Sequence, residues 1–454
     1  MIIDTQLSPA ALKDDLARFL ALSAAKIQKL DRDWDPAKGS PVFTRKGRYT
    51  SQGWTEWTQG FQFGCQILQF EATGDEEFLR LGRENTIRHM APNVSHIGVH
   101  DHGFNNVSTY GNLRRLALEG VTAESPDAMH FLELALKVSG AVQASRWTAI
   151  PGGGFIHSFN GAHSLFSDTV RSLRSLVVAH KLGHALMGEG DKRACLLDRA
   201  VQHLRATAKY NVYYGEGRDI YDVRGRVAHE SIFNVKDGAY RCPSTQQGYS
   251  AFSTWTRGLA WIMLGYAEQL EAFAAMPDED LAPFGGWKQL RGELLKPALA
   301  TCDFYIANTA TDGVPYWDTG APGLVHLGNI HDRPSQPDNP HEPVDSSAAA
   351  IAAQGLLRLG RFLGTETEDG AKYWQAGLSV ARTLLREPYL SADEAHHGLV
   401  LHSVYHRPNG WDECPGDDGV PRGESSMWGD YHAMELAVYI DSLIKGREPF
   451  TFYH

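Results

Sequence analysis

The chain has 454 residues, of which 43% are hydrophobic, so it can bury a large core in one domain or in a few. Charged residues make up 21%, which excludes wholesale disorder, and the net charge of −11 argues against a nucleic-acid partner, because phosphate binding needs a basic surface. Five widely spaced cysteines without a CxxC motif indicate neither a disulfide framework nor a zinc ribbon.

Helical periodicity dominates the chain. A first helix is predicted over 8–30, because Ser8-Pro9 is a typical helix start and the leucines that follow recur with a helical period. No series of alternating strands and crossover helices is visible, which argues against a doubly wound fold. Further helices are predicted over 54–73, 76–91, 106–119, 126–144, 162–183, 192–210, 253–275, 288–308, 345–363, 369–387 and 426–445.

These twelve helices are spaced as pairs along the whole chain. Six helical hairpins can close into an (α/α)6 barrel, and we expect an all-α protein in which residues 1–454 form a single domain of this kind. An open helical solenoid is the alternative that periodicity leaves open. The N-terminus lacks a basic region followed by an apolar run, and no stretch is as long as a membrane span, so we expect a soluble, cytoplasmic protein.

Three long stretches between the helices carry Trp, Tyr or Arg residues: 211–250, 309–344 and 388–425. Loops of this length in a compact domain are usually functional or disordered. We therefore expect these stretches to line a cleft. Aromatic residues make up 10% of the chain, which is typical of carbohydrate-binding clefts, although a large core uses such residues as well.

The stretch "VHDHGF", residues 99–104, admits three interpretations. His100, Asp101 and His102 are possible metal ligands, but no second cluster offers the missing ligands at a recognisable spacing. Asp101 could instead cap the next helix, a task for which Asn106 or Ser108 is better placed. It could also be a carboxylate in a cleft, with its histidine neighbours modifying its solvation.

Three further places carry candidate groups. In "FSDTVRSLRSL", Asp168 is expected within a helix, either as a cleft carboxylate or paired with Arg171 on an exposed face. In "TQQGYSAFSTWTRGLAW", Arg257 and Trp261 share a helix face and could form an anion and sugar platform with Gln247 and Trp255, or a cation–π pair in a packed helix. In "RGESSMWGD", Ser425 and Ser426 precede a helix and could bind an anion or simply cap it.

Taken together, these places resemble the unsaturated glucuronyl hydrolases, glycoside hydrolase family 88, and more distantly the unsaturated rhamnogalacturonyl hydrolases. The matching pieces are "VHDHGF", "SDT", "QGYSAFSTWTRGLAW", "VDSSAAAIAAQGLLRL" and "ESSMWGDYHAMEL", which occur in the family's order across roughly residues 50–445. The resemblance implies an (α/α)6 barrel, in agreement with the count of helices.

The resemblance also implies a reaction. The substrate is the Δ4,5-unsaturated uronic acid at the non-reducing end of a lyase-generated oligosaccharide. An acid protonates C4, water adds at C5, and the hemiketal that results opens and releases the next sugar. The resemblance implies no metal and no organic cofactor, an unsaturated oligosaccharide as partner, and a monomer or homodimer.

Site residues follow from the same resemblance. Asp168 matches the principal acid/base and Asp101 the second carboxylate, which assists and orients. The matching substrate-contacting positions are Trp54, Trp57, His100, His229, Gln247, Arg257, Trp261, Ser425 and Ser426. An Asp that donates a proton near neutral pH needs a raised pKa, which burial or the charge of Asp101 could supply.

One departure from the family concerns Arg171 and Arg174, because an arginine beside Asp168 would lower the pKa of Asp168 and oppose its role as an acid. Two other functions stay open on the sequence alone. The chain could be a conventional glycosidase or sugar epimerase on the same barrel, or a glycan-binding protein without catalysis. A pure binding protein has no need of two carboxylates in its cleft.

Overall fold

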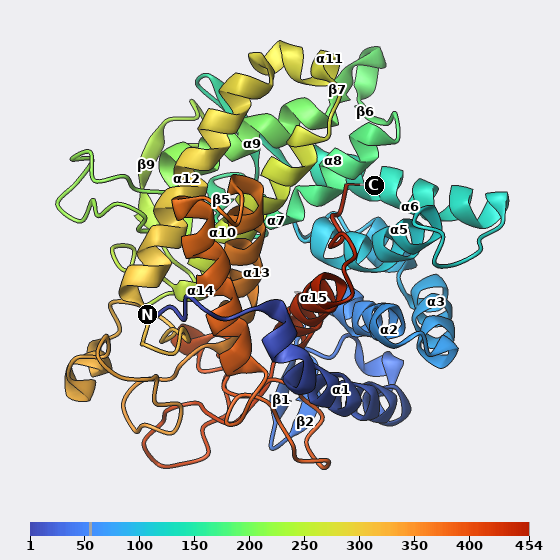
Figure 1. The fold of residues 1–454 in the computed structure, drawn as a ribbon. Helices are drawn as coiled ribbons and strands as arrows, with labels where there is room; N and C mark the ends of the chain where they lie inside the picture. The colour runs from blue at the N-terminus through green and yellow to red at the C-terminus, as the bar shows by residue number, and fades with distance from the viewer. Residues whose placement is uncertain (54–56, 454) are drawn as a thin grey trace.

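The computed structural model describes residues 1–53 and 57–453, and its long helices are arranged as pairs around a common axis (Figure 1). Each helix predicted from the sequence has a counterpart in the structure. The long helices are α1 (Lys13–Asp33), α2 (Gln59–Thr73), α3 (Glu76–His89), α5 (Asn112–Leu118), α6 (Pro126–Ser145), α8 (Arg174–Lys181), α9 (Leu196–Tyr210), α10 (Thr256–Ala274), α12 (Gly286–Asn308), α13 (Ser346–Leu363), α14 (Glu368–Leu384) and α15 (Met427–Ile444).

Short helical pieces extend this set. They are α4 (Ala91–Val94), α7 (Thr169–Ser172), α11 (Asp278–Leu281) and a π-helical segment, Gly103–Gly111, that runs directly into α5. The helix predicted over 162–183 is wrong in its first turns, because Ser164–Phe166 is a strand and the helix begins only at Thr169.

The inner wall of the barrel is a closed ring. Starting from α2, the neighbours around it are the π-helical segment with α5, then α7 with α8, α10, α13 and α15, which packs again on α2. Helices α2, α10, α13 and α15 are buried along almost their whole length, whereas α1, α3 and α14 bury only one face. This alternation of inner and outer helices is the (α/α)6 barrel that the sequence predicts.

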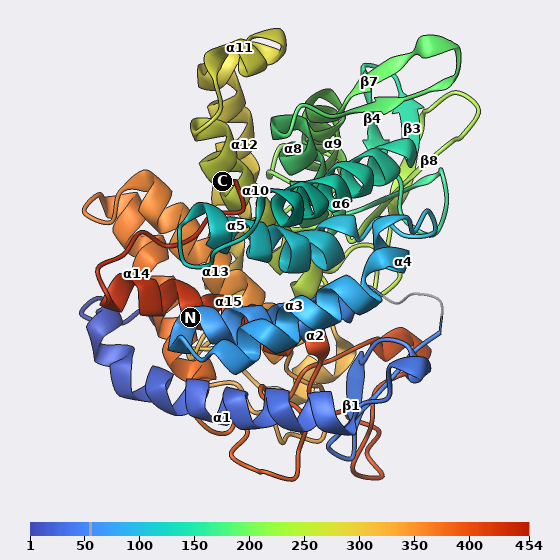
Figure 2. The same ribbon diagram turned by 90° about the vertical axis from the view of Figure 1, so that its right-hand side faces the viewer.

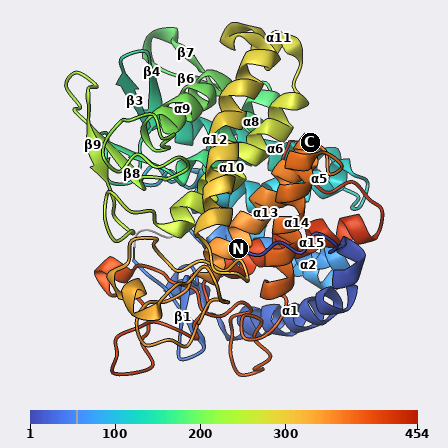
Figure 3. The same ribbon diagram turned by 60° about the vertical axis from the view of Figure 1, so that its left-hand side comes forward.

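The barrel also carries several pairs of short antiparallel strands. Their pairings are β1 (Phe43–Arg45) with β2 (Arg48–Thr50), β3 (Trp147–Ile150) with β4 (Gly153–Ile156), β6 (Ala185–Met187) with β7 (Arg193–Cys195), and β5 (Ser164–Phe166) with β8 (Glu230–Phe233), which also pairs with β9 (Tyr240–Ser244). In Figure 3, β1, β3, β4, β8 and β9 and the long loops lie to one side of the helices. The sequence predicts short β-type runs within 211–250 only, so the other strands were missed.

A fully buried ionic cluster joins three inner helices. The Arg171 guanidinium on α7 contacts Glu268 of α10 at 3.1 Å and Glu435 of α15 at 2.7 Å, and Nη1 lies 2.6 Å from the His432 ring. Arg174 lies 3.6 Å from Glu268. Because these side chains are at most 3% exposed, each charge depends on the others for compensation.

Figure 2 shows α1 running along one side of the molecule and packing beside α2. None of the helices in the described residues is long and apolar enough to cross a membrane.

The ionic cluster generates a prediction about stability. Glu268→Gln removes one charge and leaves Arg171 buried with an incomplete set of partners, so we expect the free energy of unfolding to fall by about 3–5 kcal/mol. Glu77→Gln is the matched control, because the Glu77–Arg80 pair is about half exposed and solvent screens it, so its loss should change stability much less. Urea unfolding followed by tryptophan fluorescence measures both, and equal losses would contradict the prediction.

Candidate active site

A cavity of about 170 Å³ lies among the loops that carry both predicted carboxylates. Two acidic side chains face a lining that is otherwise mostly aromatic and amide, which suits a sugar ring with its apolar faces and polar edges. The lining residues are Trp57, Val99, His100, Asp101, Phe104, Phe159, Asp168, Gln246, Gln247, Trp255, Arg257, Trp261, Tyr405, His406 and Trp411.

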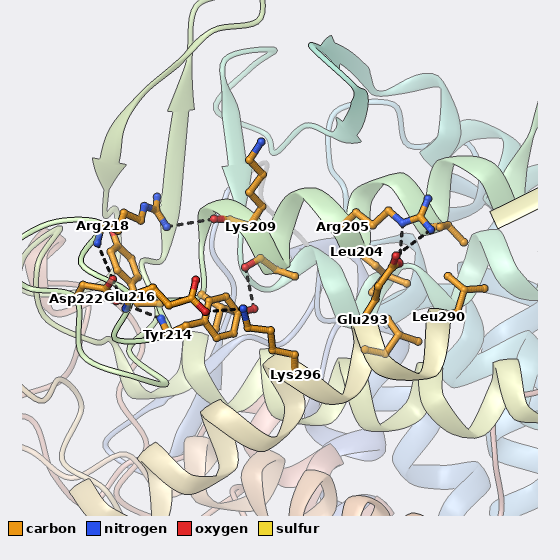
Figure 4. A pocket seen from close by; sticks show the side chains of 15 residues that line it. Leu204, Arg205, Lys209, Tyr214, Glu216, Arg218, Asp222, Leu290, Glu293 and Lys296 are labelled. Carbon is orange, nitrogen blue, oxygen red and sulfur yellow. Dashed lines mark hydrogen bonds and ion pairs between the residues drawn. The ribbon is translucent and has the colours of Figure 1, made fainter. Parts of the chain in front are cut away.

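A larger hollow of about 370 Å³ lies between the outer helices α9 and α12 (Figure 4). Its charged groups are committed to one another, since Arg205 pairs with Glu293 at 2.8 Å and Lys296 with Glu216 at 2.7 Å. Asp222 accepts hydrogen bonds from four backbone N–H groups of its own loop. The smaller cavity is therefore the candidate active site, because it contains the partly uncompensated titratable groups.

Asp101 lies where the π-helical segment begins. Its carbonyl accepts hydrogen bonds from Phe104 N at 2.9 Å and Asn105 N at 3.1 Å, which anchor the start of the helical segment. The side chains of His100 and Asp101, at this anchor, line the cavity. Asn106 and Ser108 lie inside the helical segment, so the prediction that one of them caps it is wrong.

His102 takes no part in the cavity. Nδ1 of its ring lies 3.0 Å from Ser139 Oγ and Nε2 lies 2.9 Å from the His96 carbonyl, and burial lowers its pKa to about 4. Within residues 1–53 and 57–453, His, Cys, Asp and Glu side chains form no group of three that could hold a metal ion.

The sequence predicts Asp168 within a helix, but the residue occupies the N-cap position of α7. Strand β5 delivers it to the cavity, where Oδ1 lies 3.1 Å from His100 Nε2 and Oδ2 lies 3.9 Å from His229 Nε2. The expected pairing with Arg171 is also wrong, because that guanidinium extends into the buried ionic cluster.

One imidazole links the two carboxylates. His100 Nε2 lies 3.1 Å from Asp168 Oδ1 and 3.8 Å from Asp101 Oδ1, so these two oxygens are at most about 7 Å apart. Burial lowers the pKa of His100, but the charges of Asp101 and Asp168 outweigh it, and the net pKa is raised. A proton on this ring is therefore stabilised from both sides.

The two carboxyl groups have shifted pKa values of opposite sign. Burial raises the pKa of Asp101 to about 6, an effect that the charge of His100 opposes. Burial also acts upward on Asp168, but the hydrogen bond and charge of His100 and the charge of His229 bring its pKa below the usual value. The expectation of a raised pKa at Asp168 is thus wrong, since the effect of the neighbouring imidazole outweighs that of burial.

His229 stands behind Asp168 with a defined orientation. Its Nδ1 accepts hydrogen bonds from the backbone N–H groups of Gln246 at 3.1 Å and Gln247 at 3.3 Å. These donors fix Nδ1 as the acceptor, so in the neutral ring the proton resides on Nε2, facing Asp168. Burial lowers the pKa of His229, which favours this neutral form.

Arg257 lines the cavity but is already engaged. Nη1 donates to Asp345 Oδ2 at 2.8 Å, and Nη2 donates to Gln247 Oε1 at 2.9 Å and to the Tyr405 carbonyl at 2.7 Å. Its guanidinium stacks on Trp255 at 4.5 Å and not on Trp261 as the cation–π alternative proposed. Arg257 therefore faces the cavity and also holds two of its walls, at Gln247 and at Tyr405, in place.

Most of the remaining predicted contact residues can be located. Trp57 and Trp261 line the cavity, whereas Trp54 lies outside the described residues. Ser425 and Ser426 are not among the residues that line the cavity. Ser426 caps α15 by accepting from Gly429 N at 3.1 Å, and Ser425 donates to Asp430.

Sequence reasoning missed several lining residues. Tyr405, His406 and Trp411 come from the 388–425 loop, which the sequence did predict to line a cleft. Phe159 and Gln246 carried no distinguishing signal beyond their neighbours. The 309–344 loop is wrong as a cleft wall; it lies behind the cavity, where Asp318 accepts from Tyr249 N at 2.8 Å.

The barrel and the carboxylate pair in its cavity define the chain as an (α/α)6-barrel enzyme equipped for acid–base chemistry. No family model matches the sequence. An unsaturated glucuronyl hydrolase of Formosa agariphila is 26% identical over 405 residues, which are 86% of this chain and 81% of that protein. An unsaturated chondroitin disaccharide hydrolase of Streptococcus pyogenes is 26% identical over 424 residues, or 93% of this chain and 90% of that protein.

A solved structure agrees with these relatives in fold. The crystal structure of an unsaturated glucuronyl hydrolase specific for heparin superimposes with a TM-score of 0.71 at 20% identity, covering 96% of this chain and 100% of the other. The chain is thus similar to unsaturated glucuronyl hydrolases in sequence over most of its length, and to the solved structure in fold.

The opposite pKa shifts predict opposite effects of two conservative substitutions on stability. The folded state holds a proton on Asp101 more tightly than the unfolded state, so ionising this group costs stability above about pH 6 and nothing below about pH 4. Asp101→Asn should therefore stabilise the protein at pH 7.5 by up to about 3 kcal/mol, and the gain should vanish toward pH 4.

Asp168→Asn is the matched comparison. Its lowered pKa contributes stability that is present above pH 4 and lost as the pH falls through the folded-state value, so the substitution should destabilise at pH 7.5. Calorimetric melting temperatures between pH 4.5 and 8 measure both variants. Shifts of the same sign for the two substitutions would show that the carboxylates do not differ in this way.

Proposed function

We propose that the protein removes the Δ4,5-unsaturated uronic acid from the non-reducing end of lyase-generated oligosaccharides by hydrating its C4=C5 double bond. The observation that carries the proposal is the Asp101–His100–Asp168 chain inside an aromatic cavity. Hydration needs a proton at C4 and a base for the attacking water, and a carboxylate pair with separated pKa values supplies both.

The proposal assigns each step of proton transfer to one of the two carboxyl groups. Asp168 faces the double bond as acid and then base, and Asp101 is the assisting carboxylate. Asp101 retains its proton to higher pH than Asp168, and His100 lies between the two groups. A bound uronate adds a negative charge beside Asp168, which raises the pKa of Asp168 and draws the proton onto it.

Substrate contacts follow from the lining. We propose that the sugar packs on Trp57 and Trp261, whose rings border the cavity, and that its polar edges meet Gln247, Arg257 and His229. The Nε2–H of His229 and Oδ2 of Asp168 are 3.9 Å apart, too far for a direct hydrogen bond, so one substrate or water oxygen can contact both.

The domain organisation, the cellular location and the oligomeric state belong to the same proposal. We place the whole chain, residues 1–454, in a single catalytic domain that acts in the cytoplasm as a monomer or homodimer. Supporting observations are a hydrophobic core that draws on both ends of the chain and five cysteines that are all free, as is usual in a reducing compartment.

The decisive experiment follows the ultraviolet absorbance of the conjugated alkene during incubation with unsaturated fragments of chondroitin, heparin, pectin, alginate and ulvan. We expect loss of absorbance with at least one fragment, and a rate about 10²–10⁴-fold lower for Asp168→Asn. Asp198→Asn, on outer helix α9, is the control and should retain full activity.

Isotope labelling separates hydration from ordinary glycoside hydrolysis. In D2O, protonation of the double bond leaves deuterium at C4 of the product, which NMR detects. Turnover of saturated glycosides without that label would replace the proposal with a conventional glycosidase. Calorimetric binding without any product would instead identify a glycan-binding protein.

A further inference from the structure

The hydroxyl group of Ser172 joins the two segments that carry the carboxylates. It donates a hydrogen bond to the His100 carbonyl at 2.7 Å and accepts one from Gly103 N at 2.9 Å. Its own residue lies one helical turn after Asp168, on α7. A single buried hydroxyl on the helix that begins directly after Asp168 thus binds the backbone on both sides of Asp101.

Gln143 completes this group of hydrogen bonds. We call Ser172, Gln143, His100 and Gly103 together the clasp. Gln143 Nε2 donates to the His100 carbonyl at 2.8 Å and to Ser172 Oγ at 3.1 Å. Ser172 and Gln143 are completely buried, so water cannot replace a lost partner without entering the core.

Gly103 is required for the segments to approach this closely. A Cβ atom at this position would lie 2.2 Å from the Ser172 carbonyl oxygen, which belongs to the backbone and cannot move aside. Arg174 adds a hydrogen bond to the Gly103 carbonyl at 3.0 Å. The contact between the two segments is therefore a backbone-to-backbone approach with the serine hydroxyl at its centre.

We propose that Ser172 is a positioning residue, which fixes the separation and orientation of Asp101 relative to Asp168 and so sets the rate of the chemical step. The inference rests on the proposed function. His100 is part of the same geometry, because its carbonyl is held by the clasp while its ring bonds Asp168. Displacing a reacting group by about 1 Å commonly costs about 10²-fold in rate.

Ser172→Ala tests this role, with Ser23→Ala as the control. Ser23 is buried on the outer helix α1, and its hydroxyl donates to Met434 Sδ at 2.9 Å and not to a member of the clasp. We expect kcat to fall about 10²-fold in Ser172→Ala, with KM changed less than about threefold, and kcat to stay within about threefold of wild type in Ser23→Ala. Ser172→Thr retains a hydroxyl and should recover part of the rate.

A second measurement does not depend on activity. Carbon-13 NMR titration of the Asp carboxyl groups should show a changed midpoint for Asp101 in Ser172→Ala and an unchanged one in Ser23→Ala. Equal losses of kcat in the two alanine variants, or an unchanged Asp101 titration in Ser172→Ala, would overturn the positioning role. Absence of wild-type activity on every fragment would refute the proposed function alone, because the titration still tests the clasp.

Discussion

The buried contact of Arg171 with Glu268 and Glu435 is the constraint on which the barrel's interior depends. It ties α7 to α10 and α15, three inner helices that are far apart in sequence. A charge in this position costs free energy unless its partners are correctly placed, so the cluster selects one arrangement of the helices over other apolar packings. Asp168 directly precedes the helix that carries Arg171, so the position of the carboxylate depends on this arrangement of the helices.

The cluster also separates two electrostatic environments within one helical turn. Arg171 directs its charge inward to the glutamates, so it does not neutralise Asp168, three residues earlier. Against the effect of burial, the hydrogen bond and charge of His100 then lower the pKa of Asp168, and the imidazole of His100 can change its charge near neutral pH. Had Arg171 reached Asp168, a permanent positive charge would have fixed that carboxylate in its ionised form.

The sequence predicts the barrel well because helical periodicity is a local property. The pairing of helices also follows from their spacing, and the motifs VHDHGF and SDT indicate Asp101 and Asp168. The direction of Arg171 could not be predicted, since an i,i+3 neighbour on an exposed face and a residue in the core have the same spacing. The serine pair at 425–426 shows the same limit, because capping and anion binding use identical residues and only burial distinguishes them.

The cavity walls are loops, and buried carboxylates rather than strand ladders give them a fixed shape. Asp412 accepts hydrogen bonds from the backbone N–H groups of Tyr405 and His406, and Asp318 accepts one from Tyr249 beyond the two glutamines. Burial raises the pKa of both acids to about 6. Their ionised forms make the stronger acceptors, so these loops are held most firmly where both acids are ionised, above about pH 6. Irregular loops can thus take a fixed place beside a sugar-sized site, since buried carboxylates accept hydrogen bonds from the backbone amides of Tyr405, His406 and Tyr249.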